Sequence, residues 1–68
     1  MDTVDYEGLL EAIHQKMESL GINQKEVAKQ CGLAPGMFKR IKEGKNLYLE
    51  TYLKIVNWLK VEFKEFLI

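Results

Sequence analysis

Residues 22–44 contain a helix cap, a left-handed turn and a second helix start in close succession. Asn23 belongs to the residue types that cap helix N-termini, and the Glu26 carboxylate three positions later can bond back to the Asn23 amide as a capping box. We therefore expect a helix that opens at Asn23 and runs through Cys31. Gly32 follows directly, and glycine adopts the left-handed backbone that ends many helices.

A second short helix is expected after this glycine. Ala34 is followed by Pro35, and proline is tolerated at the first helical position because its missing N–H needs no partner there. Gly44 then provides another helix-ending glycine. Two short helices joined by a tight turn form the layout of a helix-turn-helix, which we place at about residues 23–44.

The segment before this motif predicts a further helix that shares a core with it. From Tyr6 to Leu20 the apolar residues fall within about 100 degrees of a helical wheel, the width of one buried stripe, and Gly21 follows as a C-cap. The motif itself contributes the apolar residues Val27, Ala28, Cys31, Leu33, Phe38 and Ile41. A chain of 68 residues forms one domain, residues 1–68, and we expect an all-α fold, a compact bundle of four to five short helices.

A last long helix is expected at about residues 49–60. Its apolar side chains spread over about 220 degrees of the wheel, more than one buried stripe requires, and Trp58 falls on its polar side. A homodimer surface that includes Trp58, Phe66 and Ile68 would cover this excess. In the alternative interpretation, Phe63 and Phe66 fold back as a short fifth helix and complete the core of the monomer.

The ten basic and ten acidic side chains cancel, but they are unevenly distributed. Residues 25–45 hold six bases and two acids, a net charge of +4, whereas the remainder holds four bases and eight acids, a net charge of −4. An acidic body with a basic helix-turn-helix segment is typical of a small DNA-docking domain, because the local field steers the anionic partner. Ordinary surface lysines that keep a small domain soluble are the alternative interpretation.

The sequence offers no pattern for catalysis, metal binding or membrane insertion. Cys31 is the single cysteine, so it forms no internal disulfide, and with His14 as the second soft ligand it makes no metal cluster of the usual spacing. One histidine without a nucleophile and an orienting partner makes no catalytic site, so we expect neither an enzyme nor a cofactor. No apolar run approaches the roughly 18 residues that span a bilayer, and the acidic start lacks the features of a signal peptide. We therefore expect a cytoplasmic protein.

Taken together, these residues resemble the lambda-repressor-like helix-turn-helix family of phage and bacterial regulators. The resemblance extends from about Leu9 to Leu67. It is carried by Gly21, Ile22, Asn23 and Gln24, by Val27 and Ala28, by Gly32 and Leu33, by Phe38 and Ile41, by Gly44 and Lys45, by Leu49, Glu50 and Thr51, and by Ile55, Leu59 and Val61. It implies a five-helix domain that binds double-stranded DNA as a two-fold dimer, with its third helix in the major groove.

The resemblance also implies roles for individual residues. Gln24, at the start of the second helix, matches a glutamine that grips a phosphate and braces the third helix. Lys45 and Asn46 match a loop that meets the DNA backbone. Arg40 matches a base-contacting position, and its guanidinium can bind guanine O6 and N7 in a bidentate manner.

The chain departs from this family where base edges are normally read. Ala34, Pro35 and Gly36 occupy those positions, and their side chains form no hydrogen bonds, so direct readout is reduced. Pro35 and Gly36 instead allow close approach of the backbone, which favours a weak or shape-based reader. Met37 is expected on the outward face, where it can cover a thymine methyl. We therefore predict base contacts from Gly36, Met37 and Arg40, and phosphate contacts from Gln24, Pro35, Lys39, Lys42, Lys45 and Asn46.

Two functions remain open at the level of the sequence. The first is a DNA-binding transcriptional regulator, a small dimeric repressor. The second is a helix-turn-helix scaffold that serves as a protein-interaction module and binds a partner protein through Trp58 and Phe66 or through Met37. The neutral net charge slightly favours the second. Salt distinguishes them, because phosphate contacts weaken steeply with salt whereas apolar contacts do not.

Overall fold

The apolar stripes predicted from the sequence lie on helices that pack around one core. The computed structural model describes residues 4–34, 36–45 and 47–68, which form four α-helices and one short 3-10 helix. These elements are α1 (Tyr6–Leu20), α2 (Gln24–Cys31), α3 (Met37–Lys42), α4 (Leu49–Leu59) and η1 (Phe63–Phe66). The described residues therefore confirm the small all-α bundle. α2 and α3 lie where the helix-turn-helix is expected, and the assignment of that motif stays a prediction.

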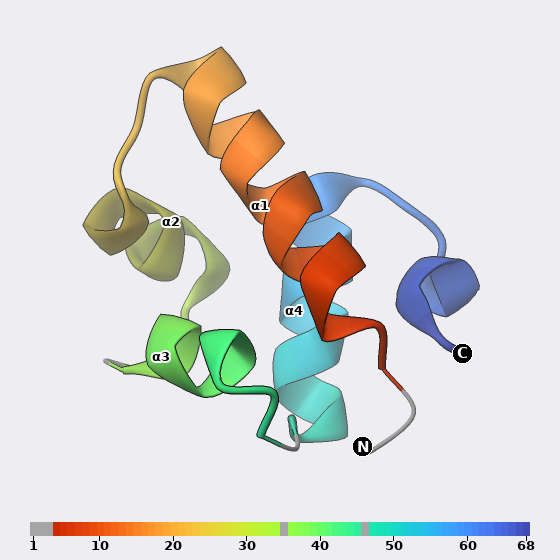
Figure 1. Ribbon diagram of the computed structural model, residues 1–68. Helices are drawn as coiled ribbons and strands as arrows, with labels where there is room; N and C mark the ends of the chain where they lie inside the picture. Colours follow the sequence, from red (N-terminus) through yellow and green to blue (C-terminus); the bar gives the residue numbers. More distant parts are fainter. Residues whose placement is uncertain (1–3, 35, 46) are drawn as a thin grey trace.

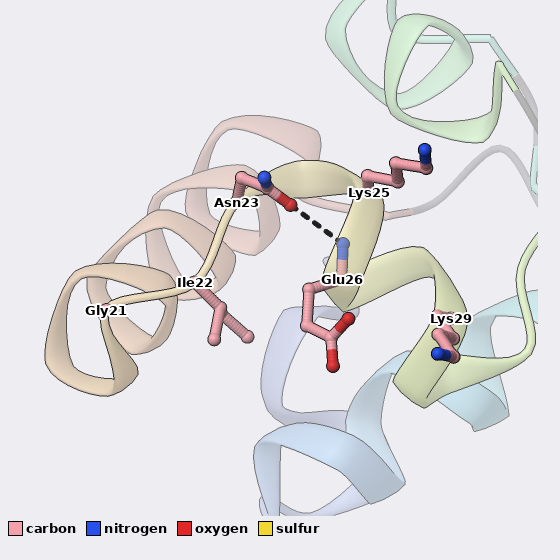
Figure 2. Close-up of a pocket in the computed structure, with 6 residues that line it drawn as sticks. All are labelled: Gly21, Ile22, Asn23, Lys25, Glu26 and Lys29. Carbon is pink, nitrogen blue, oxygen red and sulfur yellow. Dashed lines mark hydrogen bonds between the residues drawn. The ribbon is translucent and has the colours of Figure 1, made fainter.

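The ends of α1 and α2 follow the predicted caps. Gly21 ends α1 with a left-handed backbone, at a φ of 67°. The Asn23 side chain accepts a hydrogen bond of 2.9 Å from the Glu26 amide, which confirms Asn23 as the N-cap of α2 (Figure 2). The Glu26 side chain points away from Asn23 in the same view, and among the hydrogen bonds of the described residues the Asn23–Glu26 pair makes only this one, so the capping box is half formed. Gly32 ends α2 at a φ of 72°.

The start of α3 differs from the prediction. The helix begins at Met37, and Gly36 precedes it as the N-cap with a φ of 83°, a left-handed backbone that glycine adopts without a steric penalty. Pro35, the predicted first helical residue, lies outside the described residues. At the other end the amide of Gly44 bonds the carbonyl of Ile41, which makes Gly44 the helix-ending glycine as predicted, one residue beyond the cap.

The core is formed by apolar side chains from every α-helix. Leu9, Ile13, Ile41, Tyr52 and Ile55 are almost completely buried. The core also contains Val4, Val27, Cys31, Met37, Leu47 and Val56. α1 packs against α3, α4 and η1, while α2 packs against α4. Figure 1 shows α2 and α3 on one side of α1 and α4, and η1 on the other side.

The end of the chain folds back onto the bundle, as the alternative interpretation of Phe63 and Phe66 predicts. η1 is the short additional helix, and Phe66 is half-buried against the core. The Phe63 ring packs edge-to-face on Tyr52, with ring centroids 5.2 Å apart, although Phe63 stays exposed. The amide of Asp5 donates a 2.7 Å hydrogen bond to the Phe66 carbonyl, which joins the two ends of the described chain.

Candidate nucleic-acid interface

The outer face of α2 and α3 carries an open groove built from two adjoining cavities. One cavity has a volume of about 530 Å³ and the other about 270 Å³. Both are lined by Gln24, Phe38 and Lys39, so the two cavities adjoin at these residues. The larger cavity adds Lys25, Ala28, Leu33, Ala34 and Gly36, and the smaller adds Leu10, His14 and Lys42. We call these lining residues the α2/α3 face.

The geometry of α3 decides which of its side chains face this groove. At about 100° per residue, Met37 and Ile41 point to the same side of the helix, and both are buried. Lys39 then lies on the side opposite the core, and it is exposed. Phe38 and Lys42 lie on one flank, and both line the smaller cavity. Arg40 projects from the other flank.

The charge of the α2/α3 face has one sign. The lysines at positions 25, 39 and 42 are all exposed, and no aspartate or glutamate is among the described residues that line the two cavities. Lys45 differs, because its ammonium lies 3.6 Å from the Glu43 carboxylate, and this exposed ion pair offsets part of its charge. The groove therefore combines an apolar floor with a cationic rim.

Lys25 also borders a third cavity, at the turn between α1 and α2. This cavity has a volume of about 620 Å³, and Figure 2 shows the residues that line it. Lys25 extends toward the side of α2 on which α3 lies, whereas the Glu26 side chain points in a different direction. Lys29, one helical turn after Lys25, completes the basic side of α2. The lining of this turn thus includes a carboxylate beside its lysines, whereas the described residues that line the α2/α3 face include none.

Most residues predicted to contact DNA are exposed. Gln24, Lys39, Lys42, Lys45, Gly36 and Arg40 all belong to this group. The structure brings Gln24, Lys39 and Lys42 together at the groove, with Gly36 at its edge. Pro35 and Asn46, two predicted phosphate contacts, lie outside the described residues.

The predicted position of Met37 is wrong. Met37 is only 9% exposed and belongs to the core, so it does not present its side chain outward. Phe38, which was assigned to the core, is half-buried: it packs against the core cluster, as predicted, and also lines the groove. In a helix this short Ile41 can share the buried side with residue 37 or with residue 38, because spacings of three and four both bring side chains together.

Phe38, Lys25 and His14 line the groove but were not predicted as site residues. Phe38 was not recognised as a groove residue because it is apolar, and an aromatic side chain in an amphipathic helix usually belongs to the core. Lys25 contributes to the positive charge of residues 25–45, but no local pattern marks it as a site residue. His14 comes from α1 and reaches the groove through the packing of α1 on α3, which no local pattern reveals.

The predicted homodimer residues occupy different environments. Trp58 is half-buried: its indole N–H donates a 2.9 Å hydrogen bond to Gln30, and the Lys16 ammonium lies 4.6 Å from its ring centroid. Side chains of α1 and α2 therefore cover the tryptophan that we expected a partner to cover. Phe66 is half-buried within the chain, whereas Ile68 is 89% exposed. The homodimer itself stays a prediction.

Other features of the described residues define no further site. Cys31 is buried, and burial raises the pKa of its thiol, while the nearby Lys16 acts in the opposite direction. Among the described side chains, no group of three or more His, Cys, Asp or Glu is placed to hold a metal ion. No helix in the described part of the chain has the length and apolar character to cross a membrane.

Comparison with known proteins finds no relative of this chain. No family model matches the chain, and neither a curated protein nor a solved structure matches it. The fold and the α2/α3 face define a small helical protein whose described residues form a cationic groove. Its resemblance to the lambda-repressor-like family stays an expectation based on the sequence.

Proposed function

We propose that this protein is a DNA-binding transcriptional regulator, a small dimeric repressor that docks α3 in the major groove of double-stranded DNA. The single observation that carries this proposal is the charge of the α2/α3 face. Three exposed lysines and Gln24 surround a groove that has no carboxylate among its described lining residues. Most of the affinity of proteins for DNA comes from neutralised phosphates, so such a face is suited to a duplex.

The elements around the groove support contacts of two kinds. Gln24 is the first residue of α2, where the helix dipole and free backbone N–H groups favour a phosphate. Lys39 projects directly away from the core, and Lys42 lies beside it, so both can reach phosphates on either side of a groove. Arg40, on the other flank of α3, has the fork geometry that reads guanine.

A second candidate function is supported by a different surface. Tyr48 is 71% exposed and Leu49 is 51% exposed, and Leu53 follows one helical turn after Leu49 with a similar degree of exposure. Exposed apolar side chains on one helix favour contact with another protein. This surface is not the one predicted from Trp58 and Phe66, which contact their own chain.

Selection of binding sites from a pool of random duplexes, at low salt, tests the proposal. We expect an enriched and palindromic site, together with a dimer in sedimentation of the free protein. Arg40→Ala is expected to weaken binding to that site by about 1 to 3 kcal/mol and to relax the preference at one base position. Lys64→Ala provides the matched control, because Lys64 is exposed on η1, away from α3. Failure to enrich any sequence at low salt would favour the protein-interaction module.

A further inference from the structure

We propose that Phe38 reads thymine, through contact of its exposed ring surface with the C5-methyl group in the major groove. This inference rests on the proposed DNA-binding function and deepens it, because it assigns base preference to a residue that sequence reasoning had placed in the core. The observations that carry it are the position of Phe38 on α3, the two cavities that share it, and the charges on either side.

Phe38 has two different surroundings. Part of the side chain packs against the core cluster, which fixes its position. The remaining surface lines both cavities of the groove, together with Gln24 and Lys39. A ring that is anchored on one side and open on the other loses little conformational freedom when a ligand covers it. Phe38 can therefore contact a ligand with little loss of side-chain entropy.

The neighbouring charges indicate what covers this ring. Lys39 and Lys42 lie beside Phe38 on α3, and Lys25 of α2 lines the larger cavity with it. A purely apolar partner would leave these ammonium groups without counter-charges, whereas a duplex offers phosphates to them and base edges to the ring between them. Charge complementarity therefore selects DNA as the occupant of the groove.

The chemistry of base edges then selects thymine. Phenylalanine neither donates nor accepts a hydrogen bond, so it cannot distinguish the polar atoms of the major groove. The one apolar group that a standard base pair presents there is the C5-methyl of thymine. Met37, which had been expected to make this contact, is buried, and Gly36 has no side chain. On the flank of α3 that faces the groove, Phe38 is the apolar side chain positioned for the methyl group.

Replacement of thymine by deoxyuridine tests this inference, because it removes the methyl group and leaves every hydrogen-bonding atom in place. The probe is the duplex selected by the protein from the random pool, prepared with thymine and with deoxyuridine, and binding is measured by fluorescence anisotropy at low salt. We expect wild-type protein to bind the deoxyuridine duplex about fourfold more weakly, the factor that corresponds to burial of one methyl group. Phe38→Ala is expected to bind both duplexes equally.

The outcomes separate this inference from the proposed function. Equal binding of both duplexes by wild-type protein would overturn the role of Phe38 and leave DNA binding intact. Absence of salt-dependent binding to either duplex would overturn the proposed function and this inference with it. The wild-type comparison needs no substitution, so it stands even where Phe38→Ala fails to fold. Phe38→Leu, which keeps an apolar side chain, is expected to retain part of the discrimination.

Discussion

Through Trp58, Lys16 takes part in a cluster of side chains that connects three helices. It belongs to α1, its ammonium lies over the Trp58 ring of α4, and it also donates a hydrogen bond to the Trp58 carbonyl. The Trp58 indole in turn bonds Gln30 of α2. A small bundle has few such cross-links, so each one contributes a noticeable part of the stability.

Replacement of Lys16 by methionine tests this contribution. Lys16→Met keeps the apolar stem but removes the cation, and we expect a loss of about 1 to 2 kcal/mol in the free energy of unfolding, from the cation–π contact and the charged hydrogen bond. Urea unfolding followed by the fluorescence of Trp58, the single tryptophan, measures this loss. Lys64→Met is the matched control. An unchanged midpoint of urea unfolding in Lys16→Met would show that the contacts between Lys16 and Trp58 contribute nothing to stability.

Cys31 provides a second test at the scale of one residue. Burial raises the pKa of its thiol above the ordinary value of 9.0. The stabilisation from this shift is therefore fully present below pH 9.0 and is lost as the pH rises through the pKa of the folded state. We expect slow alkylation of native protein by iodoacetamide at pH 8, and rapid alkylation in urea.

A control variant isolates the thiol in that experiment. Cys31→Ala lacks the titrating group, so its stability is expected to fall less between pH 8 and pH 10 than that of the wild type. Rapid alkylation of the native protein, at the rate of the unfolded chain, would contradict the burial of Cys31.

The ends of the helices show how much of the fold can be read from local sequence. Asn23 and the glycines at positions 21, 32 and 44 predict helix boundaries correctly, because each supplies a side-chain acceptor or a left-handed backbone at the point where a helix needs it. The start of α3 could not be predicted in this way. Gly36 forms its N-cap without any side-chain bond, and a proline nearby offered a competing signal.

The end of α4 carries a strained residue that no sequence pattern marks. Lys60 has a φ of 60°, and it is the one non-glycine residue with a positive φ among the described residues. A left-handed backbone costs a residue with a Cβ about 1 kcal/mol or more relative to glycine. α4 therefore ends where glycine would be preferred.

Lys60→Gly is expected to stabilise the protein. Relief of the left-handed strain exceeds the extra chain entropy of glycine, so we expect a gain of about 0.5 to 1 kcal/mol, or a rise in Tm of several degrees for a domain of this size. Thermal unfolding followed by circular dichroism measures the shift. Gly21→Ala is the opposite control, because it places a Cβ at a φ of 67° and should lower the Tm. A lower Tm for Lys60→Gly would contradict this account of the cap.

At the scale of the whole molecule, the structure shows where the charge separation predicted from the sequence lies. The basic residues of positions 25–45 fall largely on α2 and α3, on one side of α1 and α4, while η1 covers the other side (Figure 1). The distribution of charged residues along the sequence predicted this polarity. The sequence could not show that Phe38, and not Met37, lines the groove. This depends on the rotation of α3 about its own axis against α1 and α4, which is set by tertiary packing.

The candidate site was therefore only partly predictable. Exposed lysines and Gln24 follow from helix position and charge, which are local properties. Phe38 and His14 enter the groove through contacts between α1 and α3, which are long-range. The contacts of Trp58 could not be predicted for the same reason, because Lys16 and Gln30, which cover it, are far away from it in the sequence.

The salt dependence of DNA binding tests the cationic α2/α3 face most directly. Each phosphate contact to duplex DNA contributes about −0.9 to the slope of log K against log salt, so contacts from the lysines at positions 25, 39 and 42 predict a slope of about −3. The triple variant Lys25→Ala, Lys39→Ala and Lys42→Ala should lose most of this slope, while Lys64→Ala should keep the wild-type slope. DNA binding that does not depend on the salt concentration, or a triple variant that binds DNA as the wild type does, would contradict the assignment of the α2/α3 face as the DNA-binding surface.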